Sequence, residues 1–173
     1  MTTVIWLIWG FGATLLVVTG LILLVGAPYV PTIKKARMDA LELLDLKPGQ
    51  LVIDLGCGDG RFLISAAKRG LKAEGYELNP LLVAYAWLVT RRYRKQVRVV
   101  WGNFWKADLS KADGVFVFLL DRFMQQLDDK IQKDSKGKNL KLASHAFKIP
   151  GHKSAARRGA VFLYLYGPLA KRA

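Results

Sequence analysis

One short segment of this chain combines a carboxylate with closely spaced glycines directly after an apolar run. Asp54 lies at the end of the run 51–55, and Gly56, Gly58 and Gly60 follow at every second residue. Glycines at this density let the backbone approach a ligand closely and adopt angles that other residues avoid. Because a simple turn rarely needs so many glycines, we interpret this segment as a ligand-binding loop between a strand and a helix.

The spacing of the loop indicates its ligand. A dinucleotide-binding loop reads Gly-x-Gly-x-x-Gly and places a pyrophosphate at a helix N-terminus. Here the pattern is Gly-x-Gly-x-Gly, and Asp54 and Asp59 supply carboxylates. Carboxylates would repel a pyrophosphate but attract a sulfonium and an α-ammonium group. The segment DLGCGDG therefore resembles the cofactor loop of the seven-strand S-adenosylmethionine methyltransferases, and the resemblance implies that cofactor.

Two further motifs follow the next two apolar runs. The resemblance implies that Glu77, in the segment GYELNP, accepts hydrogen bonds from both ribose hydroxyls of the cofactor, a role that suits a carboxylate. The resemblance also implies that Asn103, in the segment GNFW, pairs with the adenine edge while Phe104 or Trp105 stacks on the ring. Since parallel strands end at one edge of a sheet, the three motifs predict one cofactor site.

The order of the predicted elements would bring these motifs together. Apolar strands alternate with helical segments, which argues for a parallel sheet covered on both faces. We expect an α/β fold, a Rossmann-like doubly wound and mostly parallel sheet, with little room at the C-terminus for a seventh strand. The predicted strands cover 51–55, 72–78, 97–103, 114–120, 140–147 and 160–166.

The N-terminal region differs sharply from the rest in polarity. Residues 1–33 contain no charged side chain, and the run 4–25 is apolar apart from Gly, Ala and Thr. As a helix this run would span roughly 33 Å, the thickness of a hydrocarbon core. A signal peptide would need a basic segment before a shorter apolar one. We therefore predict a transmembrane anchor over 1–27, a linker with an amphipathic helix over 28–48, and a catalytic domain over 49–173.

The charge distribution predicts an orientation and the kind of partner. The net charge is +14, and all 27 Lys and Arg residues follow the apolar region, beginning with Lys34, Lys35 and Arg37. The positive-inside rule would then place the catalytic domain in the cytoplasm, facing an anionic leaflet. We expect a single-pass membrane protein with the lipid bilayer as a partner. Membrane docking would account for part of the charge without nucleic acid. One cysteine and two scattered histidines predict no metal site.

Several motifs together carry a resemblance to a known family. DLGCGDGR, GYELNP and GNFW resemble the cofactor motifs of the seven-strand (class I) S-adenosylmethionine methyltransferases. With PYVPT and FWKADLSKADGVFVF, they are similar to the lysine methyltransferases that modify the adenine nucleotide translocase and the c subunit of ATP synthase. The resemblance, to a prokaryotic member, implies methylation of a lysine in a membrane protein. After the fourth strand the chain departs from the family's Gly-Val-Pro-Gln, with Leu119, Leu120, Asp121 and Arg122.

The predicted cofactor site draws on the linker, the glycine-rich loop and the two following motifs. Tyr29 and Thr32 either fold over the cofactor or serve as an interfacial anchor and a helix cap. The complete predicted set is Tyr29, Thr32, Asp54, Gly56, Cys57, Gly58, Gly60, Glu77, Asn79, Asn103 and Phe104.

The catalytic step makes modest demands on the protein. A lysine must be neutral to attack a methyl group, although its ordinary pKa is about 10.4, and an apolar pocket lowers that pKa. Asp121, after the fourth strand, is the candidate catalytic residue; its alternative role is the N-cap of a helix beginning near Phe123. His145 either lines the substrate site or is structural.

Other acceptors stay open at this point. Methylation of a small molecule or a lipid at a membrane would fit the predicted anchor equally well. A nucleic-acid methyltransferase would carry an Asn/Asp-Pro-Pro-aromatic segment after the fourth strand to hold a flipped base. The segment LLDRF has no such prolines, and we expect no nucleic-acid substrate.

Overall fold

The computed structural model describes residues 2–25 and 32–168 and separates into two units, residues 1–30 and 31–173. The first unit contains helix α1 (Thr2–Val25), and the second contains every strand that is described. The predicted boundary between a linker over 28–48 and a catalytic domain over 49–173 stays a prediction.

The prediction of a membrane-spanning anchor is corrected by the structure. Among the described residues, no helix meets the combination of length and apolarity needed to cross a bilayer. The prediction depended on these two properties of the run 4–25. The predicted single-pass membrane location, with the catalytic domain in the cytoplasm, depended on that anchor and is therefore wrong. The predicted contact of the N-terminal helix with a bilayer stays a prediction.

The second unit is built on a seven-stranded sheet with the order β3-β2-β1-β4-β5-β7-β6. The first five strands pair in parallel, whereas β7 is antiparallel to both β5 and β6. The strand pairing confirms the predicted Rossmann-like, mostly parallel sheet. The sheet has seven strands, whereas six were predicted from the sequence. The strands are β1 (Leu51–Leu55), β2 (Lys72–Glu77), β3 (Val97–Trp101), β4 (Gly114–Val117), β5 (Leu140–His145), β6 (Ala156–Arg158) and β7 (Val161–Tyr166).

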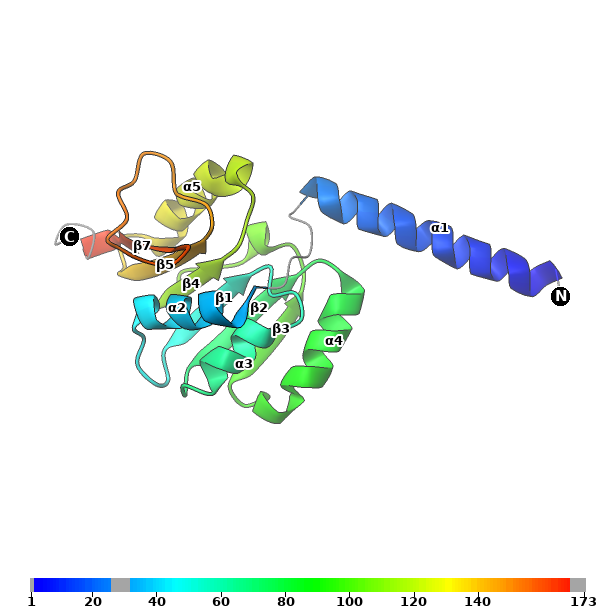
Figure 1. Ribbon diagram of the computed structural model, residues 1–173, viewed down its shortest axis with the longest axis horizontal. Coiled ribbons are helices and arrows are strands. Elements are labelled where there is room, and N and C mark those ends of the chain that lie inside the picture. The colour runs from blue at the N-terminus through cyan, green and yellow to red at the C-terminus, as the bar shows by residue number, and fades with distance from the viewer. Residues whose placement is uncertain (1, 26–31, 169–173) are drawn as a thin grey trace. The chain divides into compact units, whose positions relative to one another are not determined.

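Helices cover both faces of the sheet. Helices α2, α3 and α4 lie on one face and α5 lies on the other (Figure 1). Their bounds are α2 (Lys34–Leu44), α3 (Arg61–Ala67), α4 (Pro80–Thr90) and α5 (Met124–Ser135), with 3₁₀ turns η1 (Arg91–Tyr93), η2 (Phe104–Lys106) and η3 (Asp121–Phe123). Thr32 is not the cap of the amphipathic helix, because the N-cap position falls on Ile33 and no side chain caps it.

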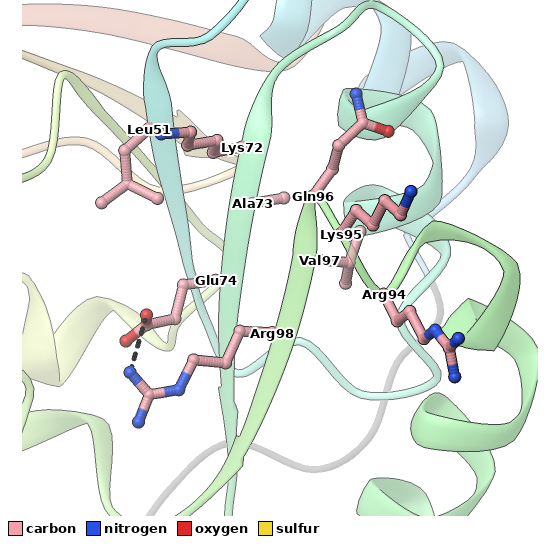
Figure 2. Close-up of a pocket in the computed structure, with 9 residues that line it drawn as sticks. All are labelled: Leu51, Lys72, Ala73, Glu74, Arg94, Lys95, Gln96, Val97 and Arg98. Carbon is pink, nitrogen blue, oxygen red and sulfur yellow. Dashed lines mark hydrogen bonds and ion pairs between the residues drawn. The ribbon is translucent and has the colours of Figure 1, made fainter.

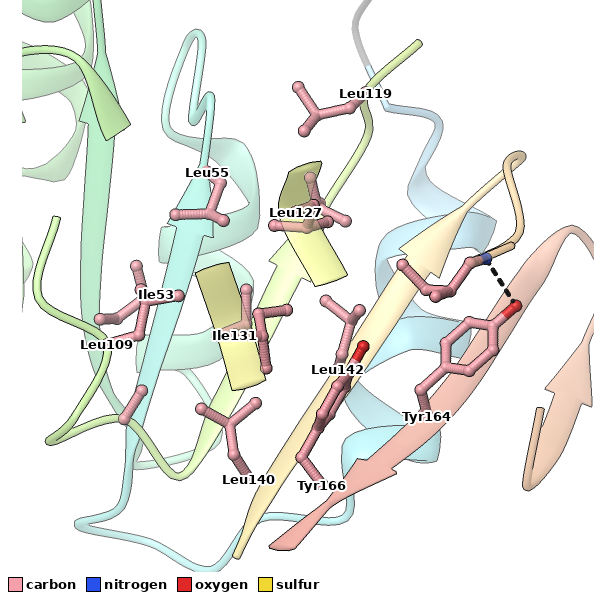
Figure 3. Packing of buried hydrophobic residues seen from close by; sticks show 14 of the residues in the cluster. Ile53, Leu55, Leu109, Leu119, Leu127, Ile131, Leu140, Leu142, Tyr164 and Tyr166 are labelled. Atoms are coloured by element: carbon pink, nitrogen blue, oxygen red, sulfur yellow. Dashed lines mark hydrogen bonds between the residues drawn. The ribbon is translucent and has the colours of Figure 1, made fainter. Parts of the chain in front are cut away.

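The core on the α5 face is one of two apolar clusters in the described part of the chain. Ile53 and Leu142 of the sheet pack against Leu127 and Ile131 of α5 (Figure 3). The Tyr164 hydroxyl accepts a hydrogen bond of 3.1 Å from the backbone N–H of Ile149, which fastens the loop after β5 to β7 (Figure 3).

The sheet order fixes where a ligand can bind. The order reverses between β1 and β4, and the loops that follow the two strands diverge there. In open α/β sheets this switch point is the usual ligand crevice. The segments after β1, β2, β3, β4 and β5 all lie at this edge of the sheet, since these strands are parallel.

Candidate functional site

The loop between β1 and α3 has the backbone that its glycines predict. Gly56, Gly58 and Gly60 have φ angles of 103°, 52° and 76°, all in the left-handed region. A Cβ added at Gly56 would meet no atom within 4 Å, whereas one at Gly60 would lie 3.3 Å from the Cβ of Ala86 and 3.2 Å from Cγ2 of Thr90. The first glycine therefore leaves open space above the loop, and the last lets the loop pack closely on α4.

Glu77, the last residue of β2, holds the loop in place. Its Oε2 accepts a hydrogen bond of 3.0 Å from the N–H of Gly58. Its Oε1 accepts bonds of 2.9 Å from the N–H groups of Leu78 and Asn79. A carboxylate offers about four lone-pair directions, so one side chain joins β1 to β2 and still has capacity for a ligand hydroxyl.

Two buried aspartates lie with Glu77 at this edge. Asp54 is 3% exposed and Asp59 is 7% exposed. Burial raises the pKa of Asp54 well above its usual range, and the charges of Glu77 and Asp59 raise it further. Asp59 pairs with the guanidinium of Arg61 and accepts its backbone N–H at 3.2 Å. Three carboxyl groups therefore lie within electrostatic reach of one another at this edge, an arrangement that favours a cation.

Both predicted asparagines also act as helix caps. Asn79 is the N-cap of α4, and its Oδ1 accepts the N–H of Leu81 at 2.9 Å. Asn103 is the N-cap of η2, and its Oδ1 accepts the N–H of Trp105 at 3.0 Å. In each case the side-chain oxygen is engaged and the amide group remains as a donor. Phe104 is buried in the core, with its ring centroid 4.7 Å from that of Trp105.

The structure adds one cation that the motifs did not indicate. Arg37 of α2 donates to the carbonyl of Thr32, and its Nε is buried without a partner among the described residues. Burial lowers the pKa of Arg37, Arg61 lowers it further, and Asp59 acts in the opposite direction. The guanidinium therefore lies within electrostatic reach of the glycine-rich loop. Tyr29, the other linker residue of the predicted set, lies outside the described residues.

The segments after β4 and β5 bring together a second group of side chains. The rings of Phe118 and His145 meet edge to face with centroids 4.6 Å apart. Burial lowers the pKa of His145, whose Nδ1 is buried and has no partner in the described part of the chain. Asp121 is exposed as the first residue of η3, and the cap position expected of it falls on Leu120 instead.

Comparison with known proteins decides the family. The family described as the ANTKMT methyltransferase domain matches residues 54–156, more than half of the 173 residues. The chain belongs to the ANTKMT methyltransferase family. The matched region begins at Asp54 and includes the glycine-rich loop, Glu77 and Asn103.

Relatives of this ANTKMT-family chain differ in how much of their own length the match spans. A protein-lysine N-methyltransferase of Saccharolobus islandicus is 38% identical over 128 residues, which are 72% of this chain and 79% of that protein. A Xenopus laevis protein, named as the lysine N-methyltransferase of the ATP synthase c subunit, is 39% identical over 111 residues, 62% of this chain. The match spans 48% of the frog protein, about half its length.

A solved structure supports the cofactor. An RNA methyltransferase from Salinibacter ruber, crystallised with S-adenosyl-L-homocysteine, superposes with a TM-score of 0.73 and 27% identity. The superposition covers 80% of this chain and 95% of that protein. The ANTKMT-family chain is therefore a methyltransferase that uses S-adenosylmethionine, and the open, carboxylate-lined loop suits the cationic part of that cofactor.

Cys57 of the ANTKMT-family loop is fully engaged within the fold. Its N–H donates to the carbonyl of Tyr76 at 2.9 Å, and its carbonyl accepts the N–H of Gly60 at 2.9 Å. The thiol is buried against Gly75 of β2, where an added Cβ would lie 2.6 Å from the Cβ of Cys57 and 2.7 Å from its sulfur. Cys57 thus packs the loop onto the sheet, and burial raises the pKa of its thiol.

This contact predicts the effect of Gly75→Ala. The new methyl group would overlap Cys57 and also Leu63, whose Cδ1 would lie 2.7 Å away. We expect a loss of about 2–3 kcal/mol in the free energy of unfolding, typical of an overpacked core, together with weaker binding of S-adenosylhomocysteine. Urea denaturation and calorimetry measure the two effects. The double variant Gly75→Ala/Cys57→Gly should recover part of the stability; no recovery would mean that Cys57 is not the limiting contact.

A small hollow lies at the opposite edge of the sheet, away from the ANTKMT-family cofactor loop. It is lined where β1, β2 and β3 begin, and Glu74 pairs there with Arg98 at 3.5 Å (Figure 2). Its lining also includes Lys72, Arg94 and Lys95. Because parallel strands bind ligands where they end, we do not assign the cofactor to this hollow.

Proposed function

We propose that this chain is a protein-lysine N-methyltransferase. The observation that carries the proposal is the 38% identity to a protein named for that activity, over 72% of this chain. Small-molecule or lipid methylation remains the alternative acceptor class. The narrower prediction, a lysine of a membrane protein, stays a prediction whose support is the family resemblance alone.

The cofactor would lie across the ends of β1, β2 and β3. Glu77 has about one lone-pair direction left, enough for one ribose hydroxyl. The amide group of Asn103 can donate to the adenine. Asp54 would face the cationic part of the cofactor, where three carboxyl groups gather. We assign Arg37 to the cofactor's carboxylate, because its partly buried guanidinium lies within electrostatic reach of the loop.

The acceptor lysine would enter where β4 and β5 end. When bound, the cofactor supplies a methyl group whose bond to sulfur breaks as the lysine nitrogen forms its new bond to carbon. The protein must position a neutral amine in line with that bond and keep water away. Phe118 and His145 offer an aromatic wall, and burial, which lowers the pKa of His145, keeps its ring neutral beside the amine. The exposed carboxylate of Asp121 can attract the incoming ammonium group.

RNA methylation is the second candidate, favoured by two specific observations. The Salinibacter ruber protein with a TM-score of 0.73 is an RNA methyltransferase. In addition, the hollow in Figure 2 is lined by four basic residues and one acidic residue. Against it, the segment after β4 has no proline to shape a pocket for a flipped base.

A direct assay separates these acceptors. The purified protein is incubated with S-adenosylmethionine carrying a labelled methyl group, together with cell protein, total RNA and extracted lipid in separate reactions. We expect label in protein, with mass spectrometry locating single methyl increments on lysine. Label that enters RNA or lipid and never a lysine would contradict the proposal.

A further inference from the structure

Helix α4 exposes apolar side chains on the side that faces away from the core. Leu81, Tyr85 and Leu88 are 58%, 53% and 59% exposed, and their spacing of four and three residues places them on one face. The opposite face buries Val83 and Ala86. A surface helix needs only one apolar face to cover a core, so the second face of α4 is available to a partner.

Two tryptophans extend this surface toward the edge of the sheet. Trp87 and Trp101 are 53% and 64% exposed. The indole N–H of Trp87 donates to the carbonyl of Val99 at 3.0 Å, which holds its ring against edge strand β3. The indole N–H of Trp101, the last residue of β3, donates to the carbonyl of Leu78 at 3.1 Å, in the segment after β2. We call Leu81, Tyr85, Trp87, Leu88 and Trp101 the α4 patch. Its three aromatic rings alone expose roughly 250–400 Å², which with the leucines reaches the size of functional patches.

Within the chain segment that carries the α4 patch, every charged residue is basic. The sequence contains no Asp or Glu between Pro80 and Ala107. Four exposed basic residues follow directly after the helix: Arg91, Arg92, Arg94 and Lys95. A complementary partner would therefore be apolar along the patch and acidic at the end that meets this basic cluster.

We propose that the α4 patch binds an apolar helix of the acceptor protein, with carboxylates at one end of that helix. This inference rests on the proposed function. A row of side chains at i, i+4 and i+7 fits the grooves of a second helix. In a bilayer interface, tryptophans keep their N–H groups for the polar headgroups, whereas here both N–H groups are engaged by the protein. The observations therefore favour a protein helix over a membrane surface.

The position of the patch suits substrate recognition. Helix α4 begins three residues after Glu77, and Trp101 ends β3 two residues before Asn103. One end of the patch thus adjoins the proposed cofactor site. A bound helix would hold the acceptor protein at this edge of the sheet, and its lysine would reach past the ends of β2 and β1 to the proposed entry at β4 and β5. Holding the acceptor there raises the effective concentration of that lysine.

Peptide binding tests the surface without any catalysis. The probe is a fluorescent helical peptide with a leucine stripe and a glutamate cluster at one end, measured by anisotropy. Two double variants test the two parts of the surface. We expect Tyr85→Ser/Leu88→Ser, in the patch, to weaken peptide binding at least tenfold. We expect the same of Arg91→Glu/Arg92→Glu, in the basic cluster. The matched control, Lys111→Glu/Lys133→Glu, changes the net charge equally at exposed sites elsewhere and should bind as the wild type does. Equal binding by all variants would overturn the proposal.

Two further measurements separate docking from the proposed function and from other occupants. A lysine peptide joined to the probe helix should show a KM about tenfold higher with Tyr85→Ser/Leu88→Ser, while the lysine peptide alone is unaffected. If neither peptide is methylated, the proposed function is refuted, and the anisotropy result still decides the docking surface.

Other occupants of the patch give different results. If the protein binds phosphatidylserine vesicles and the variant Tyr85→Ser/Leu88→Ser does not, the patch is assigned to a bilayer instead. A dimer in ultracentrifugation that this variant dissociates would assign it to a second copy.

Discussion

Replacing Glu77 with alanine should remove most of the cofactor affinity and part of the stability together. The carboxylate accepts three backbone N–H groups at 2.9–3.0 Å, and the substitution leaves all three without this acceptor. We expect the free energy of unfolding to fall by about 2–3 kcal/mol, since Glu77 is only partly buried and water can reach some donors. Loss of the proposed ribose contact should weaken S-adenosylhomocysteine binding by roughly 1.5–3 kcal/mol, about 10- to 150-fold. Calorimetry and urea denaturation measure the two quantities.

A matched control lies on the same strand. Glu74 accepts the Tyr76 hydroxyl at 2.6 Å and pairs with Arg98, at the edge away from the cofactor loop. Glu74→Ala should cost some stability but leave the affinity for S-adenosylhomocysteine unchanged. If Glu77→Ala loses stability and keeps full cofactor affinity, its role is confined to fastening the loop, and the ribose assignment is wrong.

The residues of the glycine-rich loop could be predicted because their chemistry is local. Positive φ angles at Gly56, Gly58 and Gly60 follow from a pattern that few structures other than a tight ligand loop require. The second role of Glu77 could not be predicted. Its contact with the N–H of Gly58 joins residues 19 positions apart, and it exists only because β1 and β2 pair in the observed register.

Other features escaped prediction for equally physical reasons. Strand β6 has three residues, Ala156, Arg157 and Arg158, and its exposure leaves no apolar run in the sequence. Asn79 and Asn103 were expected to face a ligand, but an asparagine before a helix also favours capping it. Arg37 lies in no motif, and only the packing of α2 onto the sheet and α3 brings it near the loop.

Replacing Asp54 with asparagine should stabilise the free protein and weaken cofactor binding. Burial, followed by the charges of Glu77 and Asp59, raises the pKa of Asp54 well above its usual range. A carboxyl group with a raised folded-state pKa contributes stability that is complete below its unfolded pKa, about 3.9. That contribution is lost as the pH rises through the folded-state pKa. Asparagine keeps the shape and never ionises, so the Tm of Asp54→Asn should exceed that of the wild type at alkaline pH and approach it at acidic pH.

The affinity for the cofactor should change with pH in the opposite direction to the stability. A sulfonium and an ammonium group beside Asp54 favour the carboxylate, so binding lowers the pKa of Asp54 and releases a proton. Affinity of the wild type should therefore rise with pH, and calorimetry in buffers of different ionisation enthalpy should detect the released proton. Asp54→Asn should lose the proton release, and its affinity for the cofactor should fall at least tenfold, the effect of losing one charge-assisted contact.

Asp113→Asn is the matched control, because Asp113 accepts the N–H of Leu51 at 2.9 Å at the other edge of the sheet. Proton release that persists in Asp54→Asn would show that another group carries the linkage and would remove Asp54 from the cationic site.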